Sequence, residues 1–230
     1  MFSTSIIELN EVRFAKNLEF LKRNIDKKTR ISSVVKGNAY GHGIETFVPL
    51  ALKYGIDHFS VFSANEAYRI YKIIGNKAEI MIMSSLDDEE LEWVINNDIN
   101  FYVFEMEKFD KIIQLCKKTG KKAKIYLEIE TGLNRTGFQF EELENVIQKI
   151  QKNSHFFEFK GITTHYAGAE KIANKNRIKK QTELFKEILQ WFSKKGFSVK
   201  TKSTASSSST LLYPDTQYDL VRLGIALYGY

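Results

Sequence analysis

Several residues whose side chains can do chemistry stand where short apolar runs of the sequence end. Lys36 ends the run ISSVVK, and an amine kept neutral by burial and by nearby cations can form a Schiff base with a carbonyl group. Judged by position alone, a lysine that ends a strand and reaches solvent is the simpler interpretation. Tyr40 follows in GNAYGHG, a loop whose glycines let the backbone approach a ligand.

Two further segments could bind acidic groups. Arg135 lies in ETGLNRTGF, a glycine-punctuated turn that would hold a guanidinium against a carboxylate or a ring oxygen, and Glu128 could orient it as an ion-pair partner. The stretch TASSSSTLLYP places hydroxyls and backbone N–H groups ahead of a short apolar helical turn, a pattern typical of anion sites. A surface arginine and a flexible polar loop are the plain alternatives.

The histidines and the cysteine indicate which chemistries to exclude. His165 in TTHYAG stands among strand residues, where a hydrogen-bonded core histidine is the commoner case, and the four histidines are too widely separated for metal-ligand spacing. We therefore expect no metal site. No GxSxG elbow is present, and no GxGxxG or GxxxxGK[ST] motif follows a predicted strand, which argues against serine hydrolases and nucleotide binding. Cys116 is the only cysteine and cannot form an internal disulfide.

The elements that would position these residues alternate along the chain. Eight short β-rich runs are separated by longer stretches of helical period, which indicates parallel strands joined by crossover helices. Eight such units close most economically into a (β/α)8 TIM-type barrel of the α/β class, and an open doubly wound sheet is the alternative. The predicted strands span residues 31–36, 57–63, 78–84, 100–105, 124–130, 159–166, 197–203 and 218–229.

A barrel would bring the candidate residues together, because barrel enzymes place their chemistry at the carboxyl ends of the strands. Lys36 would lie inside the mouth, away from bulk water, with His165 on strand six, the segment from Ser203 to Ser209 after strand seven and residues 222–225 on strand eight. The helix FAKNLEFLKRNI precedes the first strand, and we expect it to cap the bottom of the barrel. Residues 1–230 contain no evident linker and are predicted to form one domain.

Composition and charge narrow the class of partner. The sequence has 34 basic and 28 acidic residues and a net charge of +6, but its lysines accompany glutamates along helix faces, so we expect a solvated surface and no nucleic acid. No apolar run reaches the roughly 18 residues that cross a bilayer, and the first residues lack the basic-then-apolar order of a secretory signal. We therefore expect no membrane partner and a cytoplasmic location.

Five motifs, in chain order, closely resemble those of the bacterial alanine racemase family. The members of this family are fold-type III amino-acid racemases that bind pyridoxal 5′-phosphate. The resemblance extends from about residue 7 to the end of the chain, and it favours a reactive Lys36 over one that merely reaches solvent. The motifs are VVKGNAYGHG, ETGLNRTGF, GITTHYAGAE, TASSSSTLLYP and YDLVRLGIALYG.

The resemblance assigns a role to each candidate residue. It implies that Lys36 forms the Schiff base with the cofactor and is one of two proton-transfer bases, and that Arg222 faces the pyridine nitrogen. An arginine does not readily give up a proton, so the ring would be a weaker electron sink, which favours racemisation over transamination. The other assignments are Tyr40, Ser207, Gly224 and Ile225 at the phosphate, His165 against the ring, and Arg135 at the cofactor oxygen and the substrate carboxylate.

Three positions depart from the family pattern. Many members carry a lysine, often carbamylated, where this chain has Glu128, so that a carboxylate could pair with Arg135 without carbon dioxide. Ser203 and Ser206 stand in place of the histidine and the asparagine of the family pattern His-x-Ala-Asn-Ser. The histidine that supports the pyridine-side arginine is therefore missing, and we expect Arg222 to be less firmly held.

Family members also continue beyond the motif LYG into a C-terminal β-domain, which is absent from a chain that ends at Tyr230. In the family a tyrosine of that domain reaches the partner subunit's site in a homodimer and acts as the second base. Racemisation removes a proton from one face of Cα and delivers one to the other. With Lys36 as its base, we expect the chain to bind the cofactor and a small amino acid, to exchange the α-proton of one enantiomer, and to racemise poorly.

Three functions are consistent with these features. The leading hypothesis is an alanine racemase that converts L-alanine to D-alanine, a peptidoglycan precursor. A stand-alone barrel for pyridoxal phosphate binding or homeostasis, without racemase activity, is the alternative that chain length favours and the motifs oppose. A lysine-dependent aldolase or decarboxylase on the same barrel is the third.

Overall fold

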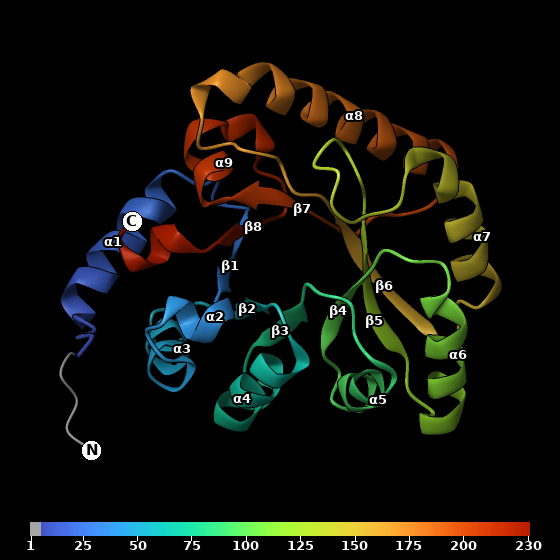
Figure 1. Ribbon diagram of the computed structural model, residues 1–230, viewed down its shortest axis with the longest axis horizontal. Helices are drawn as coiled ribbons and strands as arrows, with labels where there is room; N and C mark the ends of the chain where they lie inside the picture. The colour runs from blue at the N-terminus through green and yellow to red at the C-terminus, as the bar shows by residue number, and fades with distance from the viewer. Residues whose placement is uncertain (1–5) are drawn as a thin grey trace.

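All eight predicted runs form strands, and these strands are parallel and paired in chain order. Strand β1 also pairs with β8, with Ser32 opposite Arg222, so the sheet closes on itself. The computed structural model describes residues 6–230 and confirms the (β/α)8 barrel, which excludes the open sheet (Figure 1). The strands are β1 (Arg30–Val34), β2 (His58–Val61), β3 (Glu79–Ile82), β4 (Asn100–Val103), β5 (Ala123–Glu128), β6 (Phe157–Thr163), β7 (Thr201–Ser206) and β8 (Leu220–Leu223).

Helices follow the strands and surround the barrel (Figure 1). In α7, buried Leu143, Val146, Ile147 and Ile150 form one apolar stripe, and Gly120 ends α6 in the left-handed conformation. Among residues 6–230, no helix is both long and apolar enough to cross a membrane. The helices are α1 (Glu11–Arg23), α2 (Lys36–Tyr40), α3 (Ile44–Lys53), α4 (Ala64–Ile74), α5 (Asp88–Asn96), α6 (Lys108–Thr119), α7 (Leu143–Lys152), α8 (Lys175–Lys194) and α9 (Ser207–Leu212), with 3-10 turns η1 (Phe140–Glu142), η2 (Ile172–Asn174), η3 (Pro214–Thr216) and η4 (Ile225–Tyr228).

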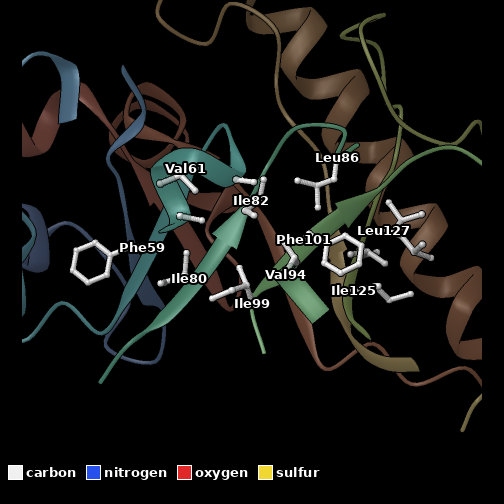
Figure 2. Close-up of a cluster of buried hydrophobic side chains, with 14 of the residues drawn as sticks. Phe59, Val61, Ile80, Ile82, Leu86, Val94, Ile99, Phe101, Ile125 and Leu127 are labelled. Atoms are coloured by element: carbon white, nitrogen blue, oxygen red, sulfur yellow. The ribbon is translucent and has the colours of Figure 1, made fainter. Parts of the chain in front are cut away.

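The main core lies between the outer face of the barrel and the helices. Phe59 and Val61 on β2, and Ile80 and Ile82 on β3, are buried residues two positions apart, so they share one face of the sheet (Figure 2). Val94 of α5 joins the same apolar cluster. Because this layer uses the outward-facing positions, the residues between them are free to carry polar side chains into the barrel.

A charged network occupies the amino ends of the first strands. Arg30 at the start of β1 forms ion pairs with Asp57, at 2.8 Å, and with Glu79, at 2.5 Å. The side chain of His58 is fully buried beside them, and its Nδ1 lies 2.8 Å from the Ser32 hydroxyl. Burial, and next the positive charge of Arg30, lower the pKa of His58 to about 4. The network therefore lies at the end of the barrel opposite to the predicted mouth.

Several strand boundaries differ from the predicted ones. Strand β1 stops at Val34 and β6 at Thr163, because the chain leaves the hydrogen-bonded ladder there. Apolar character outlasts strand pairing, since residues just past a strand, such as the fully buried Val35, still pack into the core. Lys36, His165 and Ile225 were predicted to lie on strands but follow β1, β6 and β8. Ser203 was predicted to follow the seventh strand but lies inside β7.

The expectation that the first helix caps the bottom of the barrel is wrong. Helix α1 lies along the side of the barrel (Figure 1), where Phe14 packs edge-on against Phe47 of α3 with ring centroids 5.5 Å apart. Asn17 donates a hydrogen bond of 2.7 Å to the carbonyl of Ala226 in η4. The buried Phe14, Leu18 and Leu21 form a stripe at helical spacing, and such a stripe requires an apolar surface along the length of the helix.

Candidate active site

A cavity of about 680 Å³ opens at the carboxyl ends of the strands. Its lining comes from elements that are far apart in the sequence, as expected for a barrel mouth. All eight site residues singled out in the sequence line this cavity, so the structure brings them together. They are Lys36, Tyr40, Arg135, His165, Ser207, Arg222, Gly224 and Ile225.

Residues after β2, β3 and β4 also line the cavity, although their types did not single them out. Phe62, Met83 and Phe104 form an apolar wall, and Tyr102 stands beside Thr163 with its hydroxyl 3.3 Å from the threonine oxygen. Their positions at the ends of predicted strands were the signal that could have found them. Within the described chain, no group of three or more histidine, cysteine, aspartate or glutamate side chains is placed to hold a metal ion.

The turn that carries Lys36 and Tyr40, α2, has an unusual backbone. Gly37, Asn38 and Ala39 lie in the left-handed region with φ between 55° and 61°, and Tyr40 continues it with φ of 51°. A non-glycine residue there is disfavoured by about 1–2 kcal/mol, so three of them in succession need support from their surroundings. The tight left-handed turn directs both the lysine and the tyrosine to the cavity.

Lys36 is exposed, so the expectation that it would be shielded from water is wrong. Strand β1 ends two residues before it, and the side chain therefore starts from the rim of the mouth and not from within the barrel. It still lines the cavity, so its amine is accessible to a ligand that enters from solvent.

Hydroxyl and amide groups converge beside the end of β8. The Ser207 hydroxyl accepts hydrogen bonds from the backbone N–H groups of Gly224, at 3.0 Å, and Ala226, at 3.3 Å. The Tyr40 hydroxyl lies against the backbone of Gly224, where any Cβ would collide with it. Two hydroxyls and the main chain at the end of β8 therefore meet around Gly224, and the hydroxyls can donate to an anion with several oxygens.

Arg222 is firmly held, contrary to the expectation from the missing histidine. Its Nη1 donates to the Thr163 hydroxyl at 2.8 Å and to the Ser203 hydroxyl at 2.5 Å, so Ser203 supplies an acceptor at the departing position. Its Nη2 donates to the carbonyls of Thr164, at 2.8 Å, and Thr204, at 3.2 Å. None of the ion pairs among residues 6–230 involves this buried guanidinium, so four neutral oxygens fix a full positive charge at the floor of the cavity.

His165 is a neutral imidazole in a cationic cavity. Burial, followed by the positive charges of Arg222, Arg135 and Lys36, lowers the pKa of His165 to about 3. The buried Gln181 of α8 accepts the Ala167 N–H at 3.0 Å and so supports the loop that carries the histidine. A flat, uncharged ring held at the wall of the cavity is suited to packing against another ring.

Arg135 pairs with Glu128 as predicted. The Nη2 of Arg135 lies 3.6 Å from a carboxylate oxygen of Glu128, and the Thr136 hydroxyl donates to the other oxygen at 2.8 Å. Glu130 accepts the backbone N–H of Asn134 at 2.9 Å and thereby supports the same loop. The Arg135 side chain is 59% exposed against 5% for Glu128, so a buried anion tethers a guanidinium that can still turn toward a ligand.

Comparison with known proteins identifies the family. The sequence profile of the family described as "Alanine racemase, N-terminal domain" matches residues 9–230. The chain belongs to this family. Its relatives include the alanine racemase of Treponema denticola, to which it is 32% identical over 228 residues, and that of Methanococcus maripaludis, at 30% over 224 residues. The first alignment covers 98% of this chain and 59% of the relative, and the second covers 97% and 59%.

Solved structures of alanine racemases share the barrel. The enzyme of Clostridium difficile superposes with a TM-score of 0.89 at 27% identity, covering 99% of this chain and 60% of that one. The Bacillus anthracis enzyme, described with bound L-Ala-P, gives a TM-score of 0.88 at 28% identity and covers 96% and 56%. The chain therefore spans about three-fifths of the length of the alanine racemases it matches.

Proposed function

We propose that residues 1–230 form the cofactor-binding barrel of a pyridoxal phosphate-dependent alanine racemase. The observation that carries the proposal is that all eight residues assigned by resemblance to cofactor and substrate line one cavity at the barrel mouth. Membership of the alanine racemase family supports the same reaction class. The substrate would be a small amino acid, with alanine the leading candidate.

The residues fit the proposed cofactor. The hydroxyls of Tyr40 and Ser207 would hold its phosphate, and Gly224 and Ile225 would border it. Neutral His165 would pack against the ring. Bound there, pyridoxal phosphate would supply an aldehyde for the Lys36 amine and a conjugated ring that accepts the electron pair released when the α-proton leaves.

The chain's own residues would control that proton. Lys36 would remove it from Cα on one face and return it there. Arg222 would face the ring nitrogen, and because a guanidinium does not readily release a proton, it would leave that nitrogen unprotonated and favour return of the proton to Cα. Arg135, held by Glu128, would bind the substrate carboxylate.

Racemisation also needs a base on the opposite face of Cα. We assign that role to a tyrosine from outside these 230 residues, supplied by a partner subunit of a homodimer, as the family resemblance implies. The 230 residues alone would then exchange the α-proton of one enantiomer and interconvert the two enantiomers slowly.

The test is trapping of the lysine. The chain is mixed with pyridoxal phosphate, its visible absorbance is recorded, the adduct is reduced with borohydride, and the modified peptide is mapped. We expect the label on Lys36, its loss in Lys36→Ala, and its retention in Lys72→Ala, a matched change at an exposed lysine of α4. Label scattered over surface lysines, or none, would contradict the proposal.

A second measurement separates the racemase from a cofactor carrier. Alanine is incubated in deuterated water with the loaded chain, and α-proton exchange is followed for each enantiomer. A racemase barrel exchanges one enantiomer faster than the other, whereas the alternative, a homeostasis barrel, retains the adduct on Lys36 but shows no exchange.

A further inference from the structure

The left-handed turn Lys36–Tyr40 is supported from helix α4. Two α4 residues one helical turn apart, Glu66 and Arg69, reach back to it across the β2–α4 junction. Both residues are half-buried, and neither was singled out in the sequence. Their contacts span about thirty residues of chain, so they tie two neighbouring units of the barrel together.

Glu66 has two separate tasks, one for each carboxylate oxygen. Its Oε2 accepts the N–H groups of Phe62, at 3.0 Å, and Ser63, at 3.4 Å, while the Ser63 hydroxyl accepts the Glu66 N–H, which completes a capping box at the start of α4. Its Oε1 accepts the N–H of Gly37 at 2.7 Å and that of Asn38 at 3.4 Å.

Helix α5 shows that a capping box needs only the first of these tasks. There Glu90 occupies the same N3 position, and its Oε2 accepts the Asp87 N–H at 2.9 Å. No hydrogen bond from Glu90 to another unit of the barrel occurs in the described chain. The contact from Glu66 to Gly37 is therefore additional to helix capping and calls for its own explanation.

Arg69 binds the side chain of Asn38 in the same turn. Its Nη2 donates to Asn38 Oδ1 at 2.7 Å, and that oxygen also accepts the Ile44 N–H at 3.1 Å. The guanidinium in turn is held by Glu45 of α3 through hydrogen bonds of 2.7 and 2.6 Å. Backbone and side chain of Asn38 are thus fixed together, which explains how the turn can stay in a disfavoured conformation.

We propose that Glu66 is a positioning residue for Lys36. The Gly37 N–H belongs to the peptide unit that follows Lys36, so a charge-assisted hydrogen bond to it sets the direction in which the lysine side chain leaves the backbone. Glu66 forms no ion pair with Lys36 among the described residues, so it acts through the backbone and not through the amine. This inference rests on the proposed function, because it presupposes that Lys36 binds the cofactor.

The test compares matched variants. Glu66→Gln keeps the size of the side chain but leaves one carbonyl oxygen to serve both tasks, and Glu66→Asp keeps the charge but shortens the reach. Glu90→Gln makes the same change at N3 of α5, away from Lys36. For each chain we measure cofactor affinity by absorbance titration, the share of borohydride label on Lys36, and the midpoint of thermal unfolding without cofactor.

We expect both Glu66 variants to lower cofactor affinity about tenfold and to shift label from Lys36 to surface lysines, because a charged hydrogen bond is lost or weakened. Glu90→Gln should leave affinity and labelling unchanged, and it should lower the unfolding midpoint by less than Glu66→Gln does, because it disturbs a capping box alone. Wild-type labelling of Lys36 with unchanged affinity in both Glu66 variants would overturn this inference alone. Failure of the wild-type chain to label Lys36 would overturn the proposed function and this inference with it.

Discussion

Two arginines on neighbouring strands lie at opposite ends of the barrel and have opposite surroundings. Arg30, at the amino end of β1, is neutralised by Asp57 and Glu79. Arg222, at the carboxyl end of β8, is buried among four neutral oxygens. One end therefore balances its charges within the fold, whereas the other retains a fixed positive charge, which an anionic ligand could balance.

Two histidines, the buried His58 and the half-buried His165, follow the same division. His58 is fully buried within the balanced network, and the pKa of this histidine is lowered to about 4 chiefly by burial. His165 lies at the mouth, where burial, and next the positive charges of Arg222, Arg135 and Lys36, lower its pKa to about 3. Both imidazoles are neutral near pH 7, but only the one at the mouth is placed to meet a ligand. A functional site thus differs from a structural network in its unpaired charge rather than in the size of a pKa shift.

The largest expected effect concerns acid stability. The pKa of His58 in the folded chain lies below the ordinary 6.5, so between pH 6.5 and about 4 the unfolded chain binds the extra proton and stability falls as the pH falls. The loss amounts to about 3 kcal/mol for His58. Denaturant unfolding of His58→Gln should show a shallower fall over this range, with His165 still contributing in the same direction.

His155→Gln, at an exposed histidine, provides the control for that series. If the free energy of unfolding fell equally steeply with pH in wild type and His58→Gln, the buried network would tolerate a proton on His58. The proposed difference between the two ends of the barrel would then be contradicted at the amino end.

A middle-sized effect comes from exchanging each arginine for methionine. Arg30→Met should lower the free energy of unfolding by about 2 kcal/mol, because it leaves Asp57 without its ion-pair partner and Glu79 with Lys160 alone, at 3.7 Å. The side chains of Arg30 and Glu79 are 35% and 37% exposed, so solvent screens part of the effect. Cofactor affinity should stay unchanged. Arg222→Met should destabilise the chain less and lower cofactor affinity about tenfold. Absorbance titration measures the cofactor affinity of both variants, and denaturant unfolding measures their stability. A larger loss of affinity in Arg30→Met and a larger loss of stability in Arg222→Met would contradict the difference between the two ends.

The smallest expected effect lies at the rim of the mouth. Glu128→Gln removes the buried negative charge that tethers Arg135, and we expect substrate affinity to fall by about 1 kcal/mol, or roughly fivefold. The measurement is the alanine concentration that gives half-maximal α-proton exchange in the loaded chain, with the maximal rate nearly unchanged. Glu105 lines the same cavity and forms no ion pair within residues 6–230. Glu105→Gln therefore removes a charge without breaking an ion pair, and an equal effect there would refute the role of Glu128 in holding Arg135.

Much of the architecture could be predicted because local patterns determine it. Eight apolar runs with helical stretches between them indicated the closed barrel, and the carboxyl-end rule placed residues as distant as Lys36 and Arg222 in one cavity. The side position of α1 could not be predicted, because an apolar stripe does not specify which surface it will meet.

The support of the site was also beyond sequence reasoning. Nothing in the local sequence indicates that Glu66 reaches Gly37, since the two residues meet only once β1 and β2 are paired. The hold on Arg222 was expected to be weak because one histidine is missing, yet hydroxyls and carbonyls from two other strands replace it. The sequence therefore indicated which side chains belong to the candidate site, but the long-range partners of these side chains depend on closure of the barrel.

Closure itself joins the first strand to the last, and this has a consequence for synthesis on the ribosome. Strand β1 pairs with β8, and Tyr228 donates a hydrogen bond to the Val34 carbonyl across 194 residues of sequence. Until residues 220–228 have emerged, one edge of β1 has no partner strand, and contacts of such separation form slowly. Until then the nascent sheet stays open, and the mouth with the proposed cofactor site is still incomplete.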